Sequence, residues 1–139
     1  MSTYRNQRPV VEYTYDNAGN LASLTDAASG GGNATVWDYD RLNRRITETV
    51  NPGSENFVTS FGYDQVGNQT TMTDANGRTT EWSFDKLHRP LHEYWKNSSD
   101  VDIHDIEYTY DLASQLISLS SARRASGTDP WSVYQDYSY

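Results

Sequence analysis

The chain has 139 residues, a formal net charge of −8 and no cysteine. Its length is enough for one domain, and the lack of cysteine excludes a disulfide scaffold, a zinc-thiolate site and a thiol nucleophile. With only 11 basic residues it lacks the electrostatic footprint that a polyanion requires, so we predict no nucleic-acid partner.

The first predicted element is a β-hairpin. Residues 1–8 are polar and patternless, and we expect a frayed N-terminal end there. Apolar and polar residues then alternate up to Tyr15, which is typical of a half-buried strand. Asp16 to Asn20 has turn chemistry, and Leu21 to Thr25 is predicted to be the returning strand. One repeat is therefore predicted to be one hairpin.

The second hairpin follows a glycine-rich connection at 26–34. Residues 35–40 are the predicted outgoing strand. Residues 46–50 are rich in β-branched side chains and are the predicted returning strand. In the turn between them Asn43 replaces glycine, as the next most tolerant residue for a left-handed conformation. Residues 51–54 are predicted to form the outer turn.

Three further units repeat this scheme, with predicted inner turns at 64–68, 85–89 and 111–114. The Asn76-Gly77 pair is a strong hairpin signal, so the third and fourth repeats should be neighbours in the sheet. Lys96 to Asp100 is interpreted as a polar loop. The turn of the fourth repeat and that of the fifth, at Ser114, lack glycine like the second, and the sequence leaves open a different geometry for all three.

The period of the pattern indicates a repeat architecture. The second aromatic residue of each copy recurs along the chain from Tyr15 to Tyr139, at successive spacings of 24, 24, 21, 26 and 29 residues. Aliphatic residues are few, and 18 aromatic rings replace them as the material for packing. We predict an all-β fold with a repeat region at 9–139 whose units are near 9–26, 34–51, 57–75, 78–96, 103–121 and, cut within a repeat, 130–139.

The predicted site is a structural motif and not a catalytic one. The paired aromatics of neighbouring hairpins are expected to stack across the sheet, and each Asp is expected to accept hydrogen bonds from the amides of its turn. The motif residues are Tyr13, Tyr15, Asp16, Gly19, Trp37, Tyr39, Asp40, Phe61, Tyr63, Asp64, Gly67, Trp82, Phe84, Asp85, Tyr108, Tyr110 and Asp111.

The run Tyr13-Thr-Tyr15-Asp16-Asn-Ala-Gly19-Asn20-Leu21 resembles the YD repeats of the RHS family. Such repeats occur in bacterial RHS polymorphic toxins, the C subunit of insecticidal toxin complexes, wall-associated proteins and animal teneurins. The resemblance implies a long sheet of hairpins that spirals into a hollow shell, which encloses a C-terminal effector in the toxins. No segment matches the self-cleaving RHS core, so no catalytic residue is carried over.

The resemblance implies that the chain is a non-catalytic section of a protective shell. The shell would belong to a secreted or surface-delivered protein, and the leading interpretation is that this protein is bacterial. The implied partners are further YD repeats or another copy through the sheet edges, and an enclosed effector polypeptide. We predict no cofactor, no metal site and no membrane span, and no targeting signal lies within this sequence.

Two alternatives from other functional classes stay open. Exposed tryptophans beside acidic residues could stack on sugar rings, which would make the chain a carbohydrate- or surface-binding module; these are Trp37, Trp82, Trp95 and Trp131. An enzyme is the other alternative, based on His88, His92 and His104. His88 and His92 are expected on a turn and on its returning strand, and no nucleophile motif accompanies them.

Overall fold

The computed structural model describes residues 11–26, 33–52, 55–123, 130 and 132–138, which form eleven strands and no helix. The expectations for 1–8, for the glycines of the first connection and for Trp131 fall outside these residues. The chain divides into two compact units, residues 1–59 and 60–139. Each unit is therefore described by itself.

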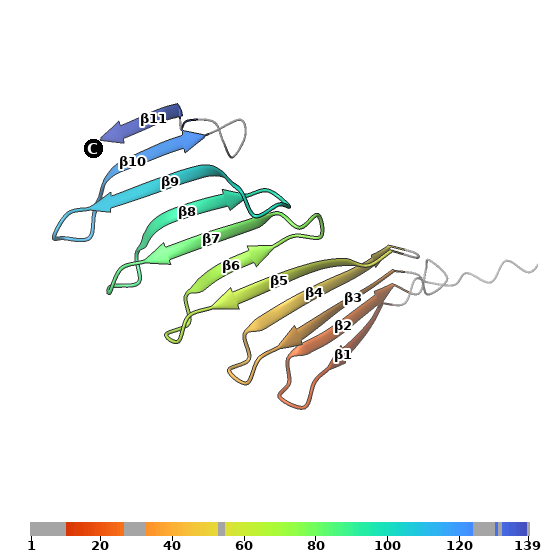
Figure 1. Ribbon diagram of the computed structural model, residues 1–139. Helices are drawn as coiled ribbons and strands as arrows, with labels where there is room; N and C mark the ends of the chain where they lie inside the picture. The colour runs from red at the N-terminus through yellow and green to blue at the C-terminus, as the bar shows by residue number, and fades with distance from the viewer. Residues whose placement is uncertain (1–10, 27–32, 53–54, 124–129, 131, 139) are drawn as a thin grey trace, which may run out of the picture. The chain divides into compact units, whose positions relative to one another are not determined.

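The first unit is an antiparallel ladder in which the strands follow one another in sequence order (Figure 1). Its strands are β1 (Val11–Tyr15), β2 (Leu21–Asp26), β3 (Asn33–Tyr39) and β4 (Arg45–Pro52). β2 pairs with both β1 and β3, and β3 pairs with β4. Of the outer turn expected at 51–54, Asn51 and Pro52 belong to β4, and residues 53–54 lie outside the described residues.

The second unit repeats this arrangement. Its strands are β5 (Phe57–Tyr63), which begins just before the unit boundary, β6 (Gln69–Thr73), β7 (Thr79–Phe84), β8 (Pro90–Lys96), β9 (Asp102–Tyr110), β10 (Leu116–Arg123) and β11 (Ser132–Ser138). Each is antiparallel to the next, from the β5/β6 pair to the β10/β11 pair. The predicted all-β fold of successive hairpins is confirmed, and so is the pairing of the third and fourth repeats through β6 and β7.

The first aromatic of each repeat faces the residue eleven positions later across its hairpin. The five pairs are Tyr13 with Leu24, Trp37 with Glu48, Phe61 with Met72, Trp82 with Glu93 and Tyr108 with Leu119. Because side chains alternate between the two sides of a strand, this register places Phe61, Trp82, Trp95 and Tyr108 on one side of the second unit. We call that side the aromatic face.

Neither unit has a conventional core. None of the described residues, apolar or polar, is buried, and large apolar side chains such as Tyr15 and Trp95 stay 65% and 43% exposed. A single layer of sheet has two open sides, and strand pairing joins each hairpin to the next where the structure describes both. Stability in such a repeat architecture comes from contacts between adjacent repeats.

Candidate functional site

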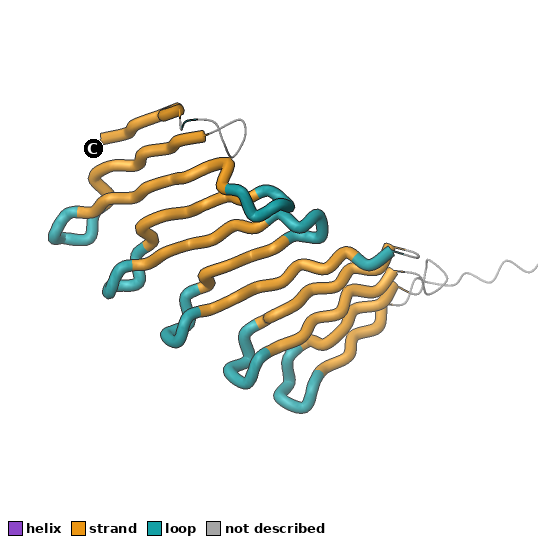
Figure 2. Tube along the Cα trace, in the orientation of Figure 1, coloured by secondary structure: helices purple, strands orange, loops and turns teal. Residues whose placement is uncertain are grey.

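The most regular feature of the structure is a turn that recurs seven times within the described residues. The amide of its first residue donates to the carbonyl of the fifth at 2.9–3.0 Å, and the amide of the fourth donates to the carbonyl of the first at 2.9–3.3 Å. The first residues are Asp16, Asp40, Asp64, Asp74, Asp85, Asn97 and Asp111. Inner and outer turns thus share one geometry, and they alternate between the two ends of the strands (Figure 2).

The side chain of the first residue holds each turn from within. In the third repeat Oδ1 of Asp64 accepts from the amides of Val66, Gly67 and Asn68 at 3.0, 2.8 and 2.8 Å. The amides two and four residues on make the same bonds to Asp16, Asp40, Asp74 and Asp85. In the fifth repeat Asp111 accepts from Gln115 at 2.8 Å. These are the amide bonds expected of the Asp residues.

The fourth residue of the turn lies in the left-handed region. Three of the seven positions hold glycine, with φ of +88° at Gly19, +103° at Gly67 and +75° at Gly77. The others are Asn43, His88, Asp100 and Ser114, with φ between 59° and 66°. The second, fourth and fifth repeats therefore keep the geometry of the glycine turns. The different geometry that the sequence left open for these three turns is not observed. The backbone and side-chain hydrogen bonds of each turn hold the non-glycine residue in the left-handed region.

The segment 96–100, interpreted as a loop, contains another copy of this turn. Oδ1 of Asn97 accepts from the amides of Ser99 and Val101 at 2.9 and 3.2 Å, as the Asp side chains do elsewhere. Asp100 takes the left-handed position. An amide oxygen accepts the same hydrogen bonds as a carboxylate oxygen, so Asn97 can begin this turn in place of the Asp found in the other six.

The fifth residue of the turn was missed by the sequence reasoning. Its side chain returns to Oδ2 of the Asp at 2.7–2.9 Å, from Nδ2 of Asn20 and Asn68 and from Nε of Arg44, Arg78 and Arg89. The arginines add an Nη2 contact to the same oxygen at 2.6–2.7 Å. An Asp followed four residues later by Asn or Arg is the signal that could have revealed it.

These bonds lower the pKa of five turn carboxyls below 3.8, those of Asp16, Asp40, Asp64, Asp74 and Asp85. For Asp16 and Asp74 the main cause is the side chain of Asn20 or Arg78, and for Asp40 and Asp85 it is the amide of the fifth residue. At Asp64 desolvation raises the pKa, but the donors of its turn together outweigh it. The pKa of these five carboxyls falls because their charged form accepts the hydrogen bonds better than the neutral form does.

Neighbouring inner turns are bonded to each other. Nδ2 of Asn20 donates to Oδ1 of Asn43 at 3.0 Å, and Nδ2 of Asn68 lies 3.1 Å from Nδ1 of His88. In both cases the fifth residue of one turn reaches the left-handed residue of the next. Arg89 likewise reaches forward, to the Asp111 carbonyl at 3.4 Å. We call this series of contacts the turn ladder.

The second aromatic of each repeat stands where the hairpin register shifts by one residue, directly before the turn. These residues are Tyr15, Tyr39, Tyr63, Phe84 and Tyr110. The hydroxyl of Tyr39 donates to the Leu21 carbonyl at 2.9 Å, and the Arg89 guanidinium lies over the Tyr110 ring, 4.5 Å from its centre. These contacts are polar and cationic, and ring-on-ring stacking of the motif aromatics stays a prediction.

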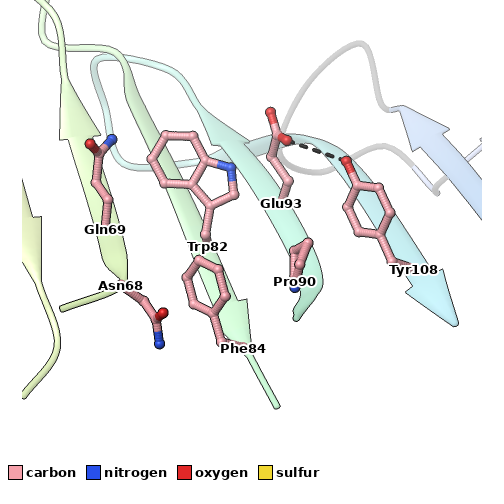
Figure 3. Close-up of a pocket in the computed structure, with 7 residues that line it drawn as sticks. All are labelled: Asn68, Gln69, Trp82, Phe84, Pro90, Glu93 and Tyr108. Atoms are coloured by element: carbon pink, nitrogen blue, oxygen red, sulfur yellow. Dashed lines mark hydrogen bonds between the residues drawn. The ribbon is translucent and has the colours of Figure 1, made fainter. Parts of the chain in front are cut away.

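The aromatic face has a hollow over β7, β8 and β9 with a volume of about 440 Å³ (Figure 3). It is lined by Asn68, Gln69, Trp82, Phe84, Pro90, Glu93 and Tyr108. The Tyr108 hydroxyl donates to Oε2 of Glu93 at 3.5 Å. Desolvation, followed by the charge of that carboxylate, raises the pKa of Tyr108.

The opposite side of the second unit carries acids and their partners. Nδ1 of His92 lies 3.3 Å from Asp105, and Nζ of Lys96 contacts Glu81 at 2.9 Å. Desolvation and the nearby Asp105 raise the pKa of Tyr94. His88 is on a turn and His92 on the returning strand, as predicted. Across the described ranges no group of three or more His, Cys, Asp or Glu could hold a metal.

Part of this chain is similar in sequence to known RHS-repeat and toxin proteins. The RHS Repeat family model matches residues 58–94. A curated relative, double-stranded DNA deaminase toxin A of Burkholderia cenocepacia (strain H111), is 34% identical over 99 residues, which cover 57% of this chain and 7% of that toxin. The part of the chain that the structure describes contains no long apolar helix of the kind that crosses a membrane.

Solved structures share the fold. The crystal structure of TcdB2-TccC3 matches with a TM-score of 0.72 and 24% identity, over 84% of this chain and 6% of that chain. The Photorhabdus luminescens Tc holotoxin pore matches with the same TM-score and identity, over 84% of this chain and 5% of that one. This chain therefore spans only a small part of the proteins it resembles. The recurring Asp turn, the RHS Repeat match over residues 58–94 and the shared fold together show that this chain is similar to RHS-repeat (YD-repeat) proteins.

Proposed function

We propose that this chain is a non-catalytic section of a β-shell in a secreted or surface-delivered toxin-like protein. The shell encloses or displays a C-terminal effector, and these repeats form part of the wall of the shell. The observation that carries the proposal is the single layer of repeated hairpins without any buried residue among those described, in a fold shared with TcdB2-TccC3. Such a layer is suited to enclosing something, because its aromatic face is free to line an interior.

The chemistry of the motif supports an architectural role. The Asp carboxylates are engaged by amides of their own turns, so they are not available as acids, bases or ligands. The activity named for the Burkholderia toxin is not carried over, because the match covers 7% of that protein. The glycan-binding alternative is not favoured, since the relatives are toxins and Trp37 donates its indole N–H to Glu48 at 2.8 Å.

The proposal is tested by limited proteolysis of the longer polypeptide that contains these repeats. A segment downstream of the repeats should resist cleavage while the shell is intact. The double substitution Asp64→Ala and Asp85→Ala should open two turns and expose that segment to protease. Glu55→Ala, at an exposed position outside the turns, is the matched control. Equal cleavage rates in all three proteins would contradict an enclosing function.

A further inference from the structure

Two repeats carry a Trp opposite a Glu where the other three have an aromatic residue opposite Leu or Met. The pairs are Trp37 with Glu48 and Trp82 with Glu93. In both repeats the Glu lies eight positions after the turn Asp, so the two sites are equivalent in the fold. A carboxylate among aromatic rings requires polar or cationic partners, because removing its charge from water is unfavourable.

In the second repeat the chain supplies the cation itself. Nη1 of Arg45 contacts Oε2 of Glu48 at 2.7 Å, and the indole of Trp37 donates to the same oxygen at 2.8 Å. Arg45 stands five positions after Asp40, where β4 begins. This repeat therefore contains a complete site, in which a guanidinium neutralises the Glu beside a Trp.

In the fourth repeat the corresponding position holds Pro90, which has no charge to offer. Glu93 receives only neutral donors, the indole of Trp95 at 2.5 Å and the hydroxyl of Tyr108 at 3.5 Å. Within the described residues no cationic side chain forms an ion pair with it. The adjacent Arg89 is engaged elsewhere, with Nε 2.7 Å from Asp85.

The hollow of about 440 Å³ lies beside this carboxylate, and in Figure 3 Pro90 and Glu93 stand between Trp82 and Phe84 on one strand and Tyr108 on another. Trp82, Phe84 and Tyr108 contribute three aromatic rings to its lining. A cation close to such rings is attracted by the negative potential of their faces, and Trp is the best partner. The net charge of −8 adds long-range attraction for cations.

We propose that this hollow binds an alkyl guanidinium or ammonium group, with Glu93 as its counter-ion and Trp82, Phe84 and Tyr108 as its walls. The ligand takes the position that the Arg45 side chain occupies in the second repeat. An arginine or lysine side chain of a polypeptide lying on the aromatic face carries this group. The inference goes beyond the proposed shell function and does not depend on it.

The test is a titration of the whole chain with N-acetyl-arginine amide, followed by the indole N–H signals in ¹⁵N NMR spectra. The Trp82 signal should shift with a dissociation constant in the millimolar range. N-acetyl-citrulline amide, which has the same shape without the charge, should bind at least about tenfold more weakly, as should the arginine probe to Glu93→Gln. N-acetyl-lysine amide distinguishes an ammonium from a guanidinium preference, and binding of either supports the site.

Pro90→Arg provides an independent variant that keeps the carboxylate. It should place a guanidinium on Glu93 from within the chain and so abolish binding of the probe. Glu48→Gln is the matched control in the second repeat, and it should leave the Trp82 shift unchanged. Equal binding of the citrulline and arginine probes, undiminished binding to folded Glu93→Gln or Pro90→Arg, or a response to cellotetraose in place of the cations would each overturn the proposal.

Discussion

At the scale of single residues, the turn depends on an acceptor at its first position and on tolerance of positive φ at its fourth. The left-handed region costs a residue with a side chain roughly 1–2 kcal/mol relative to glycine. Four of the seven turns accept that cost, at Asn43, His88, Asp100 and Ser114. The side-chain and backbone bonds of the turn therefore outweigh the local strain.

Replacing Ser114 by glycine should relieve this strain. Its φ is 66°, and the side chain of Ser114 lies exposed. We expect Ser114→Gly to raise the free energy of unfolding by about 1 kcal/mol, somewhat reduced by the extra flexibility of glycine in the unfolded chain. Urea unfolding measures this, with Ala113→Gly, one residue earlier, as a control expected to destabilise. If Ala113→Gly stabilised the chain and Ser114→Gly did not, the claim that Ser114 is under backbone strain would be refuted.

Removing the acceptor should have the opposite effect. Asp64→Ala leaves the amides of Val66, Gly67 and Asn68 without their shared carboxylate oxygen. The melting temperature should fall by a few degrees, and hydrogen exchange at those three amides should accelerate. Gln65→Ala, in the same turn, serves as the control. Unchanged melting and unchanged exchange in Asp64→Ala would show that the carboxylate does not hold the turn.

At the scale of elements, hairpins are joined through strand pairing and through the turn ladder. Arg89 makes several contacts, because its guanidinium bonds Asp85, reaches the Asp111 carbonyl and lies over the Tyr110 ring. Lysine has the charge but not the planar fork of donors that makes these contacts simultaneously. Besides the pairing of β8 with β9, the Arg89 side chain therefore links the turns of the fourth and fifth repeats.

Arg89→Lys should loosen two turns at once. Amide exchange should accelerate in the turn that begins at Asp85 and also in the turn that begins at Asp111, where the Gln115 amide is a suitable probe. Arg78→Lys is the matched control, because Arg78 bonds Asp74 in its own outer turn. Acceleration confined to the turn of Asp85 would contradict coupling through Arg89.

At the scale of the whole molecule, stability is distributed over many small, nearly identical contacts. No buried core among the described residues concentrates it. The same carboxylate hydrogen bonds recur from one repeat to the next, so a solution condition that affects one turn affects all of them together. A single open sheet also has edge strands. The backbone N–H and C=O groups on the outer side of an edge strand have no neighbouring strand to pair with.

Acid should therefore unfold the chain. The pKa values of Asp16, Asp40, Asp64, Asp74 and Asp85 lie below their ordinary value of 3.8. The unfolded chain then binds more protons, so stability is full above about pH 4 and is lost as pH falls through the lowered pKa values. Circular dichroism against pH measures the transition. Asp64→Asn should weaken the pH dependence, because an amide accepts the same bonds, as Asn97 does, without titrating.

The exposed edge should promote association between copies. Every residue of β1 is exposed, including Val11 at 44%. We expect dimers or larger species whose proportion rises with concentration, measured by size-exclusion chromatography with light scattering. Val11→Lys should shift the distribution towards monomer, because charged side chains on an edge strand oppose pairing. A monomer at all concentrations would refute this expectation.

The sequence by itself determined the hairpins. Alternating side chains, Asp at each strand end and the Asn76-Gly77 pair are local signals, and hydrogen bonds between near neighbours in the chain are enough to realise them. The inner turn predicted at 64–68 therefore lies between the two observed strands of the third repeat, which end at Tyr63 and begin at Gln69. The Asn97 turn escaped only because its first residue is an amide and not an acid.

The tertiary structure alone decided which side chains of different repeats meet. The contact between Asn68 and His88 spans 20 residues, and that between Arg89 and Asp111 spans 22. Such contacts depend on strand register and on a bulge before each turn, and a one-residue slip would redirect every side chain to the other face. The same register makes Pro90 the counterpart of Arg45, which leaves Glu93 beside an open hollow.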